Sequence, residues 1–194
     1  TGTLSGSYNS AEIAKKIYLE EHPDTKIHVI DSLSAGGEVD LIVRKLNHLV
    51  AEGLDFDQVV DGITAYQAKT KLLFVLAKVD NLVKNGRLSK LVGTVVGLLN
   101  IRMVGEASKT GTLELLQKAR GQKKAIKAAF DELLKAGYAG GHITIAHRNN
   151  EKFIEQFSEL VREKFAQASI EVLPTSGLCS FYAEEGGLLM GYEI

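Results

Sequence analysis

The sequence predicts an α/β fold, in which a parallel sheet is covered by helices on both faces. Helix-like and strand-like segments alternate along the chain, and the loops between them are short. The 194 residues are 45% hydrophobic and 24% charged, which is typical of a folded protein with a sizeable core. This length suits one large domain or two small ones. We expect a boundary near residues 67–71, which divides the chain into residues 1–68 and 69–194.

The first predicted element is a helix that ends at about Glu21. The stretch NSAE at residues 9–12 has the spacing of a capping box. The amide of Asn9 can accept from a free backbone N–H of the first turn, and the carboxylate of Glu12 can reach back to the N–H of Asn9. The stretch HPD at residues 22–24 ends this helix. Residues 26–31 include the β-branched residues Ile27, Val29 and Ile30, so we expect a buried strand there.

Two more helices are predicted before the boundary. Apolar residues recur at steps of three and four over residues 38–52, and Gly53 stands at the expected C-cap position. Residues 56–68 supply the second helix. This order of helix, strand and helix is typical of a parallel sheet with both faces covered.

The second part is predicted to mix helices with more strands. Its strands are expected at residues 72–76, 101–106, 111–113, 142–146, 170–173 and 178–181, and its helices at residues 79–84, 88–99, 123–136 and 151–167. The last segment contains Gly186, Gly187 and Gly191, which suit either a tight turn or a close approach of the backbone to a ligand. We expect a turn. The aliphatic residues 91–99 suit either a core helix or the wall of a lipid tunnel, with core as the default.

The composition disfavours several classes of protein. Lys and Arg number 23 against 24 Asp and Glu, so no overall basic field attracts nucleic acid. Cys179 is the single cysteine, which excludes an intramolecular disulfide and Cys-based zinc sites and fits a reducing compartment. No apolar run reaches the roughly 20 residues of a membrane span, and the amino end has no signal-peptide pattern, so we expect a cytoplasmic protein without stable membrane insertion. His142 and His147 lie at opposite-facing strand positions, so we expect no metal site.

A loop of hydroxyl residues and glycine precedes the first helix. In LSGS at residues 4–7, Ser5 and Gly6 stand where free N–H groups and the helix dipole favour an anion such as a carboxylate. A simple helix cap explains the same residues. A nucleophilic role for Ser5 is disfavoured because no GxSxG motif surrounds it.

Two clusters of cations are further candidates. Gly86 allows a tight turn, and Arg87 presents a planar donor fork that suits a carboxylate, although a solvated arginine is the common case. Lys118, Arg120 and Lys124 concentrate positive charge in an otherwise balanced chain. They suit the docking of an acidic partner, or form an ordinary solvated face.

Five stretches in register resemble the DegV family. They are TGTLSGS at residues 1–7, VIDS at 29–32 with the following GG, LVKNGRLS at 82–89, LLNIR at 98–102, and KARG at 118–121 with the KA that follows. They correspond to the family patterns SSxLSGT, VIDS, YLKKGGRIS, LLNIK and KxRGxxKA. The resemblance runs over essentially the whole chain.

The resemblance implies a two-domain fold and a function in bacterial lipid binding and phospholipid metabolism. The fold would be a partial three-layer α/β/α domain followed by a two-layer α+β domain with a mixed sheet. The protein would enclose a long-chain fatty acid between the domains and present its carboxylate to a fatty acid kinase, without being an enzyme itself or needing a cofactor. Ser5, Gly6 and Arg87 match the carboxylate-binding residues, and Lys118, Arg120 and Lys124 the kinase-docking stretch.

The sequence also departs from the family pattern. Tyr182 stands at the histidine position of the family motif HTGPG, and a tyrosine hydroxyl can donate to a carboxylate but carries no positive charge near neutral pH. The family motif TSQPS is absent, so we expect an amino-terminal part to be missing. Two alternatives stay open: a substrate-binding subunit of a dihydroxyacetone-kinase-like phosphotransferase, and a nucleic-acid-binding or regulatory protein that uses the basic stretch.

Overall fold

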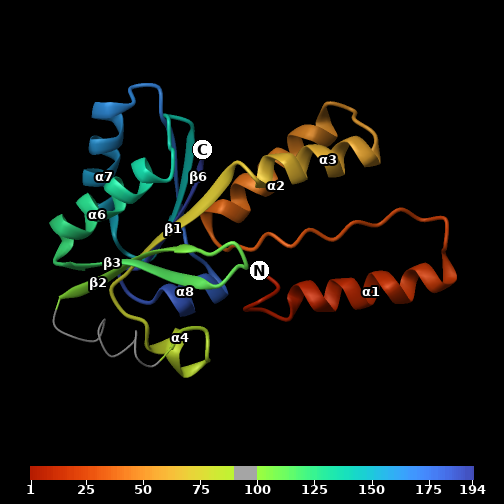
Figure 1. The fold of residues 1–194 in the computed structure, drawn as a ribbon, viewed down its shortest axis with the longest axis horizontal. Coiled ribbons are helices and arrows are strands. Elements are labelled where there is room, and N and C mark those ends of the chain that lie inside the picture. Colours follow the sequence, from red (N-terminus) through yellow and green to blue (C-terminus); the bar gives the residue numbers. More distant parts are fainter. Residues whose placement is uncertain (90–99) are drawn as a thin grey trace.

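A six-stranded mixed sheet forms the centre of the protein (Figure 1). The computed structural model describes residues 1–89 and 100–194. The strands lie in the order β3-β2-β1-β6-β4-β5, and β4 and β5 are parallel while the other neighbours are antiparallel. The elements are α1 (Ser7–Glu21), α2 (Gly37–Ala51), α3 (Phe56–Gln67), β1 (Thr70–Leu76), α4 (Asp80–Lys84), β2 (Ile101–Ala107), β3 (Leu113–Arg120), α6 (Gln122–Lys135), β4 (His142–His147), α7 (Glu151–Lys164), β5 (Ser169–Pro174), α8 (Gly177–Ala183) and β6 (Leu188–Glu193). The predicted α/β class with a mixed sheet is confirmed.

Each face of the sheet has its own core. On one face, α6 and α7 pack on strand residues that include Leu73, Ile143 and Tyr192, all fully buried. On the other face, Phe74 and Met103 pack with residues of α4 and α8. Alternate residues of each strand point to opposite faces, so one strand sequence serves both cores. Helices therefore cover both faces of this mixed sheet.

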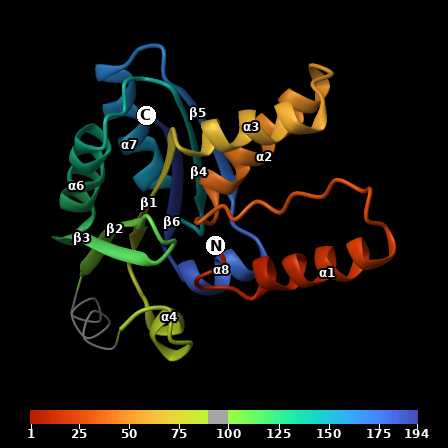
Figure 2. The same cartoon turned by 45° about the vertical axis from the view of Figure 1, so that its right-hand side comes forward.

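The first helix stands away from the sheet. Figures 1 and 2 show α1 and the extended segment after it reaching outward together, with α2 and α3 on the other side of that segment. α1 has no buried residue, and Ile13 and Ile17 are exposed. It begins at Ser7 with Gly6 as N-cap and no side-chain cap, so the predicted start at the capping box of residues 9–12 is wrong.

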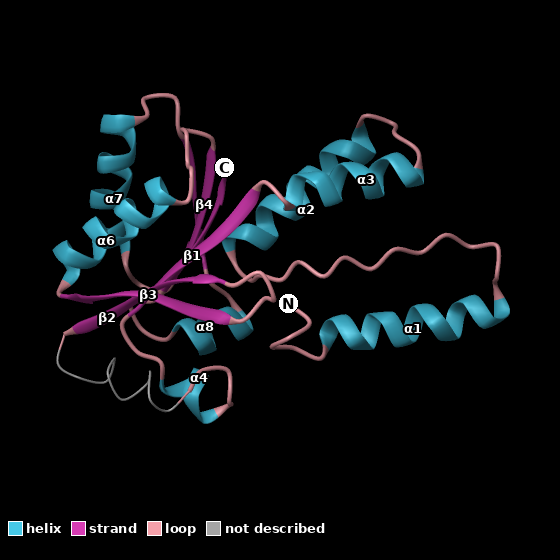
Figure 3. Cartoon of the chain, viewed as in Figure 1, coloured by secondary structure: helices cyan, strands magenta, loops and turns pink. Residues whose placement is uncertain are grey.

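The strand predicted at residues 26–31 is wrong. Figure 3 shows the segment as a loop, and it belongs to no described sheet. Ile27, Val29 and Ile30 are only half-buried, and Ile30 packs on the small core between α2 and α3. A strand needs a hydrogen-bonded neighbour, and no other described strand lies beside this segment. The segment is apolar, but the strand pairing that this composition predicts is not formed.

The carboxyl-terminal elements also differ from the prediction. Residues 178–181 lie in helix α8 instead of a strand, and the expected glycine loop contains β6, the strand between β1 and β4. Gly191 serves a close approach and not a turn, because a Cβ there would lie 2.2 Å from the backbone nitrogen of Glu38. β3 is longer than expected and runs to Arg120. The predicted division into two domains stays a prediction, and the apolar helix predicted at residues 88–99 lies almost wholly outside the described residues.

Candidate functional site

A largely apolar cavity of about 730 Å³ lies beside the sheet. Its wall combines the loop before α1, the loop before α2, and residues of β1, α4, α8 and β6. Phe74, Leu76 and Leu189 form apolar parts of this wall, and Leu82 and Leu178 contribute from α4 and α8. Cavities of this size and character are typical of sites for small apolar molecules. We call this cavity the central pocket.

The loop before α1 brings Ser5 to the central pocket. Its hydroxyl lies 3.0 Å from the Ser7 hydroxyl and accepts a hydrogen bond from the Ser7 backbone N–H at 3.3 Å. Gly6 is exposed and does not line the pocket, although it directly follows Ser5 in the chain. Part of the hydrogen-bonding capacity of Ser5 is therefore used to order the start of α1.

Arg87 reaches the same pocket from the turn after α4. Gly86 has φ +71° and lets the chain reverse there. The Arg87 Nε donates to the Leu4 carbonyl at 3.2 Å and Nη1 to the Asn85 carbonyl at 2.6 Å. Its guanidinium group lies 5.6 Å from the centre of the Tyr182 ring. The structure therefore brings Ser5, Arg87 and Tyr182, which are far apart in sequence, to one cavity.

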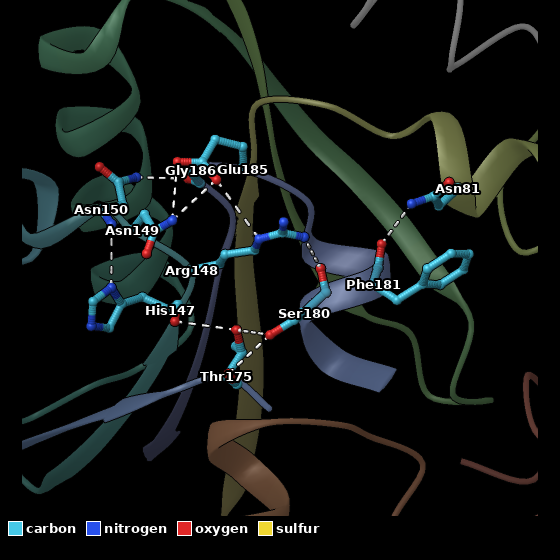
Figure 4. A network of polar contacts seen from close by, with 10 residues as sticks. All are labelled: Asn81, His147, Arg148, Asn149, Asn150, Thr175, Ser180, Phe181, Glu185 and Gly186. Atoms are coloured by element: carbon cyan, nitrogen blue, oxygen red, sulfur yellow. Dashed lines mark hydrogen bonds and ion pairs between the residues drawn. The ribbon is translucent and has the colours of Figure 1, made fainter. Parts of the chain in front are cut away.

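Helix α8 supplies Tyr182 and is held by a polar network through the neighbouring residues Ser180 and Phe181 (Figure 4). The Ser180 hydroxyl donates to the Thr175 carbonyl at 2.9 Å, and Arg148 Nη1 donates to the Ser180 carbonyl at 2.8 Å. Asn81 Nδ2 donates to the Phe181 carbonyl at 2.8 Å, which links α8 to α4. These contacts fix the helix whose residues form one wall of the pocket.

Sequence reasoning did not single out Asp31 as a site residue. Its Oδ1 accepts hydrogen bonds from the backbone N–H groups of Gly2 at 2.9 Å and Leu33 at 3.0 Å. It thereby joins the loop that carries Ser5 to the loop before α2, and it lines the pocket itself. Its sequence signal is its place in the VIDS stretch at residues 29–32, which resembles the DegV family pattern.

Glu38 is a buried acid in the first turn of α2. Its carboxylate accepts a hydrogen bond from the Thr70 hydroxyl at 2.8 Å, and the residue is 6% exposed. Burial raises the pKa of Glu38 above its ordinary value, although the neighbouring Ser34 and Thr70 hydroxyls and the charge of Lys71 act in the opposite direction.

We expect Glu38→Gln to stabilise the protein at neutral pH. A raised pKa means that the folded state favours the protonated form of Glu38. In the wild type, the stability that comes from this protonated acid is complete below the pKa of the unfolded state and is lost as pH rises through the pKa of the folded state. Glutamine keeps an oxygen acceptor for Thr70 and carries no charge. The melting temperature of Glu38→Gln should exceed that of the wild type at pH 7, and the difference between the two melting temperatures should disappear as pH falls below 4.5. Glu20 is exposed, so the control variant Glu20→Gln should melt at the same temperature as the wild type. A wild type that is more stable than Glu38→Gln at pH 7 would refute the prediction.

The residues predicted to dock a kinase lie outside the central pocket. Lys118 and Arg120 are on β3 and Lys124 is on α6, and all three are exposed. They do not line the central pocket, and no ion pair joins any of them to the described part of the chain. Lys127, one turn further along α6, pairs with Asp131 at 2.8 Å. The three residues form a surface separate from the pocket.

Other candidate chemistry finds little support in the described residues. Within residues 1–89 and 100–194, no group of three or more His, Cys, Asp or Glu residues is arranged to hold a metal ion. His142 and His147 lie at opposite ends of β4. In the same ranges, no helix combines the length and hydrophobicity of a membrane span. Cys179 is a free thiol that lines the central pocket.

Comparison with known proteins identifies one group of relatives. The family model described as "Uncharacterised protein, DegV family" matches residues 1–192. A DegV domain-containing protein of Streptococcus pneumoniae is 79% identical over 194 residues, which are the whole of this chain and 69% of the relative. A DegV domain-containing protein of Streptococcus pyogenes is 66% identical over the same length, and 69% of it is covered.

Solved structures of similar proteins contain fatty acids. The Fatty Acid Kinase (Fak) B3 protein of Streptococcus pneumoniae, loaded with linoleic acid, matches with a TM-score of 0.97 and 79% identity, over 100% of this chain and 69% of that one. A DegV family protein of Eubacterium eligens, loaded with heptadecanoic acid, matches with a TM-score of 0.94 and 39% identity, over 100% of this chain and 70% of that one.

Proposed function

Because this chain belongs to the DegV family, as its motifs predict, we propose that it binds a long-chain fatty acid in the central pocket and presents the carboxylate to a fatty acid kinase. In this proposal it acts in the bacterial cytoplasm as a carrier without catalytic activity of its own. The fatty acid is its only ligand, and no cofactor takes part. The observation that carries the proposal is an apolar cavity of about 730 Å³ with Ser5, Arg87 and Tyr182 on its wall.

The chemistry of this wall suits a fatty acid. A buried carboxylate needs donors, because removing it from water without hydrogen bonds is costly. The Ser5 hydroxyl, the guanidinium of Arg87 and the Tyr182 hydroxyl are such donors on the pocket wall. Gly6 does not line the wall, and its proposed part is limited to the backbone N–H that it places next to Ser5 at the start of α1. The apolar walls suit the tail. Burying about sixteen carbons at ~0.8 kcal/mol per methylene yields on the order of 10 kcal/mol before ordering costs.

The binding proposal is tested by loading and extraction. The purified chain is incubated with a mixture of long-chain acids, separated from free acid by gel filtration and extracted with organic solvent. Mass spectrometry should find about one long-chain acid per protein molecule. Recovery of no acid above the level of a control protein would refute the proposal.

We expect Arg120→Ala to separate binding from kinase coupling. Lys118, Arg120 and Lys124 lie outside the pocket, so truncation of the arginine leaves acyl binding unchanged. It removes an exposed charge from the proposed docking surface, and we expect acyl-phosphate formation by an added fatty acid kinase to fall about tenfold. Lys127→Ala is the matched control, since this lysine already pairs with Asp131 at 2.8 Å. Loss of acyl binding together with kinase coupling would show that the two roles are not divided in this way.

A further inference from the structure

Helix α8 ends at a residue with an unfavourable backbone conformation. Glu184 directly follows the last helical residue, Ala183, and has φ +53° and ψ −173°. Residues with a side chain rarely adopt a positive φ, whereas glycine does so without steric cost. A glutamate persists in such a conformation only where the surrounding structure stabilises it. A contact of Glu184 must therefore offset this cost.

The side chain of Glu184 holds the start of α4. Its Oε1 accepts a hydrogen bond from the backbone N–H of Asn81 at 2.9 Å. Asn81 acts in the opposite direction, because its Nδ2 donates to the carbonyl of Phe181 in α8 at 2.8 Å (Figure 4). Each of the two elements therefore supplies one side chain that bonds the backbone of the other. We call this reciprocal pair of hydrogen bonds the α4–α8 clamp.

The α4–α8 clamp joins the two elements that position the donors of the central pocket. Tyr182 belongs to α8 and lies two residues before Glu184. Arg87 follows α4, and its backbone N–H donates to the carbonyl of Leu82 in α4 at 2.8 Å. The guanidinium of Arg87 lies 5.6 Å from the centre of the Tyr182 ring. The position of α4 relative to α8 therefore decides where the guanidinium lies relative to the tyrosine.

We infer that Glu184 is a positioning residue, which holds α4 against α8 so that Arg87 and Tyr182 meet the same fatty acid carboxylate. This inference rests on the proposed function. Glu184 does not line the central pocket, so it acts on the ligand only through these two residues. Its backbone conformation lowers stability, while its carboxylate fixes the position of Arg87. A purely structural residue would instead support stability and the binding of every ligand together.

Glu184→Gly separates stability from binding. Glycine adopts the positive φ without strain but removes the acceptor for Asn81, so the melting temperature should not fall below that of the wild type. In displacement of a fluorescent fatty acid, we expect stearic acid to bind about tenfold more weakly, the effect of one hydrogen bond. Stearyl alcohol has no carboxylate for Arg87, so its affinity should stay close to the wild-type value.

Two further variants control for the substitution itself. Glu184→Gln keeps a side-chain oxygen for the Asn81 N–H and should bind stearic acid as the wild type does. Asp80→Asn alters an exposed acid in the first turn of α4. In the described part of the chain no hydrogen bond joins the Asp80 side chain to α8, so this variant should also bind as the wild type does.

The double variant Arg87→Ala/Glu184→Gly tests whether Glu184 acts through the arginine. If it does, Glu184→Gly should weaken stearic acid no further once Arg87 is absent. Full additivity of the two changes would overturn the inference, as would equal weakening of acid and alcohol by Glu184→Gly. A Glu184→Gly protein that binds stearic acid as tightly as the wild type would overturn it while leaving the proposed function intact. A wild type that binds no acid would refute the proposed function, and this inference with it.

Discussion

Gly37→Ala is expected to lower the free energy of unfolding by about 3 kcal/mol, which is the upper part of the usual range for overpacking. The added Cβ would lie 2.1 Å from the Thr144 carbonyl oxygen and 2.7 Å from the Gly191 backbone nitrogen. Both are backbone atoms of central strands, so they cannot rotate aside as a side chain would. The methyl group would instead force α2 away from β4 and β6.

Urea unfolding followed by circular dichroism measures this effect. Gly6→Ala is the matched control for stability, because no atom lies within 4 Å of a Cβ there and φ is −70°. Its free energy of unfolding should stay within about 0.5 kcal/mol of the wild type. An unchanged unfolding midpoint for Gly37→Ala would show that α2 shifts without cost, and that the close contact does not fix the wall of the pocket.

The same contact explains why β6 was not predicted. Leu188, Met190 and Tyr192 alternate as a strand should and are fully buried, but the intervening Gly191 resembled part of a loop. The glycine is required because α2 crosses the strand there, and nothing in the local sequence reveals that crossing. The elements with clear periodicity, such as α7 and β4, were predicted correctly because their own sequences contain the signal.

The short helix α8 and the segment at residues 26–31 failed for related reasons. In α8, Leu178 and Tyr182 share one helical face that lines the pocket, but a seven-residue helix is too short for this spacing to outweigh a strand-like composition. Residues 26–31 have a strand-like composition, but no described strand lies beside them to form a sheet. In both cases tertiary context decides the structure.

Site residues could be predicted from sequence where they belong to a family-like motif. Ser5, Arg87 and Tyr182 were named from family-like stretches, and the structure places all three on one cavity, although their role with a ligand stays a prediction. Asp31 could not be ranked as a site residue from sequence. Its importance comes from a hydrogen bond to the Gly2 N–H, which joins two loops distant in the chain.

Arg87→Ala is expected to weaken fatty acid binding about 30-fold, which corresponds to about 2 kcal/mol. Two of its N–H groups bond the carbonyls of Leu4 and Asn85, so the side chain both holds the Ser5 loop and keeps its charge at the pocket. Truncation would remove a donor for the carboxylate and release the loop that carries the second one. Arg87→Lys should restore only part of the affinity, because an ammonium group lacks the planar fork that spans both carbonyls.

Displacement of a fluorescent fatty acid measures these affinities, and Arg44→Ala is the matched control. Arg44 is an exposed arginine of α2 that pairs with Asp40 at 2.6 Å and does not line the pocket, so its loss should leave binding unchanged. A fatty alcohol of the same chain length separates the two roles of Arg87. If the arginine acts on the carboxylate, Arg87→Ala should weaken the acid far more than the alcohol. Equal weakening would mean that Arg87 acts only by holding the loop, and equal affinity of wild type and variant for the acid would place the carboxylate elsewhere.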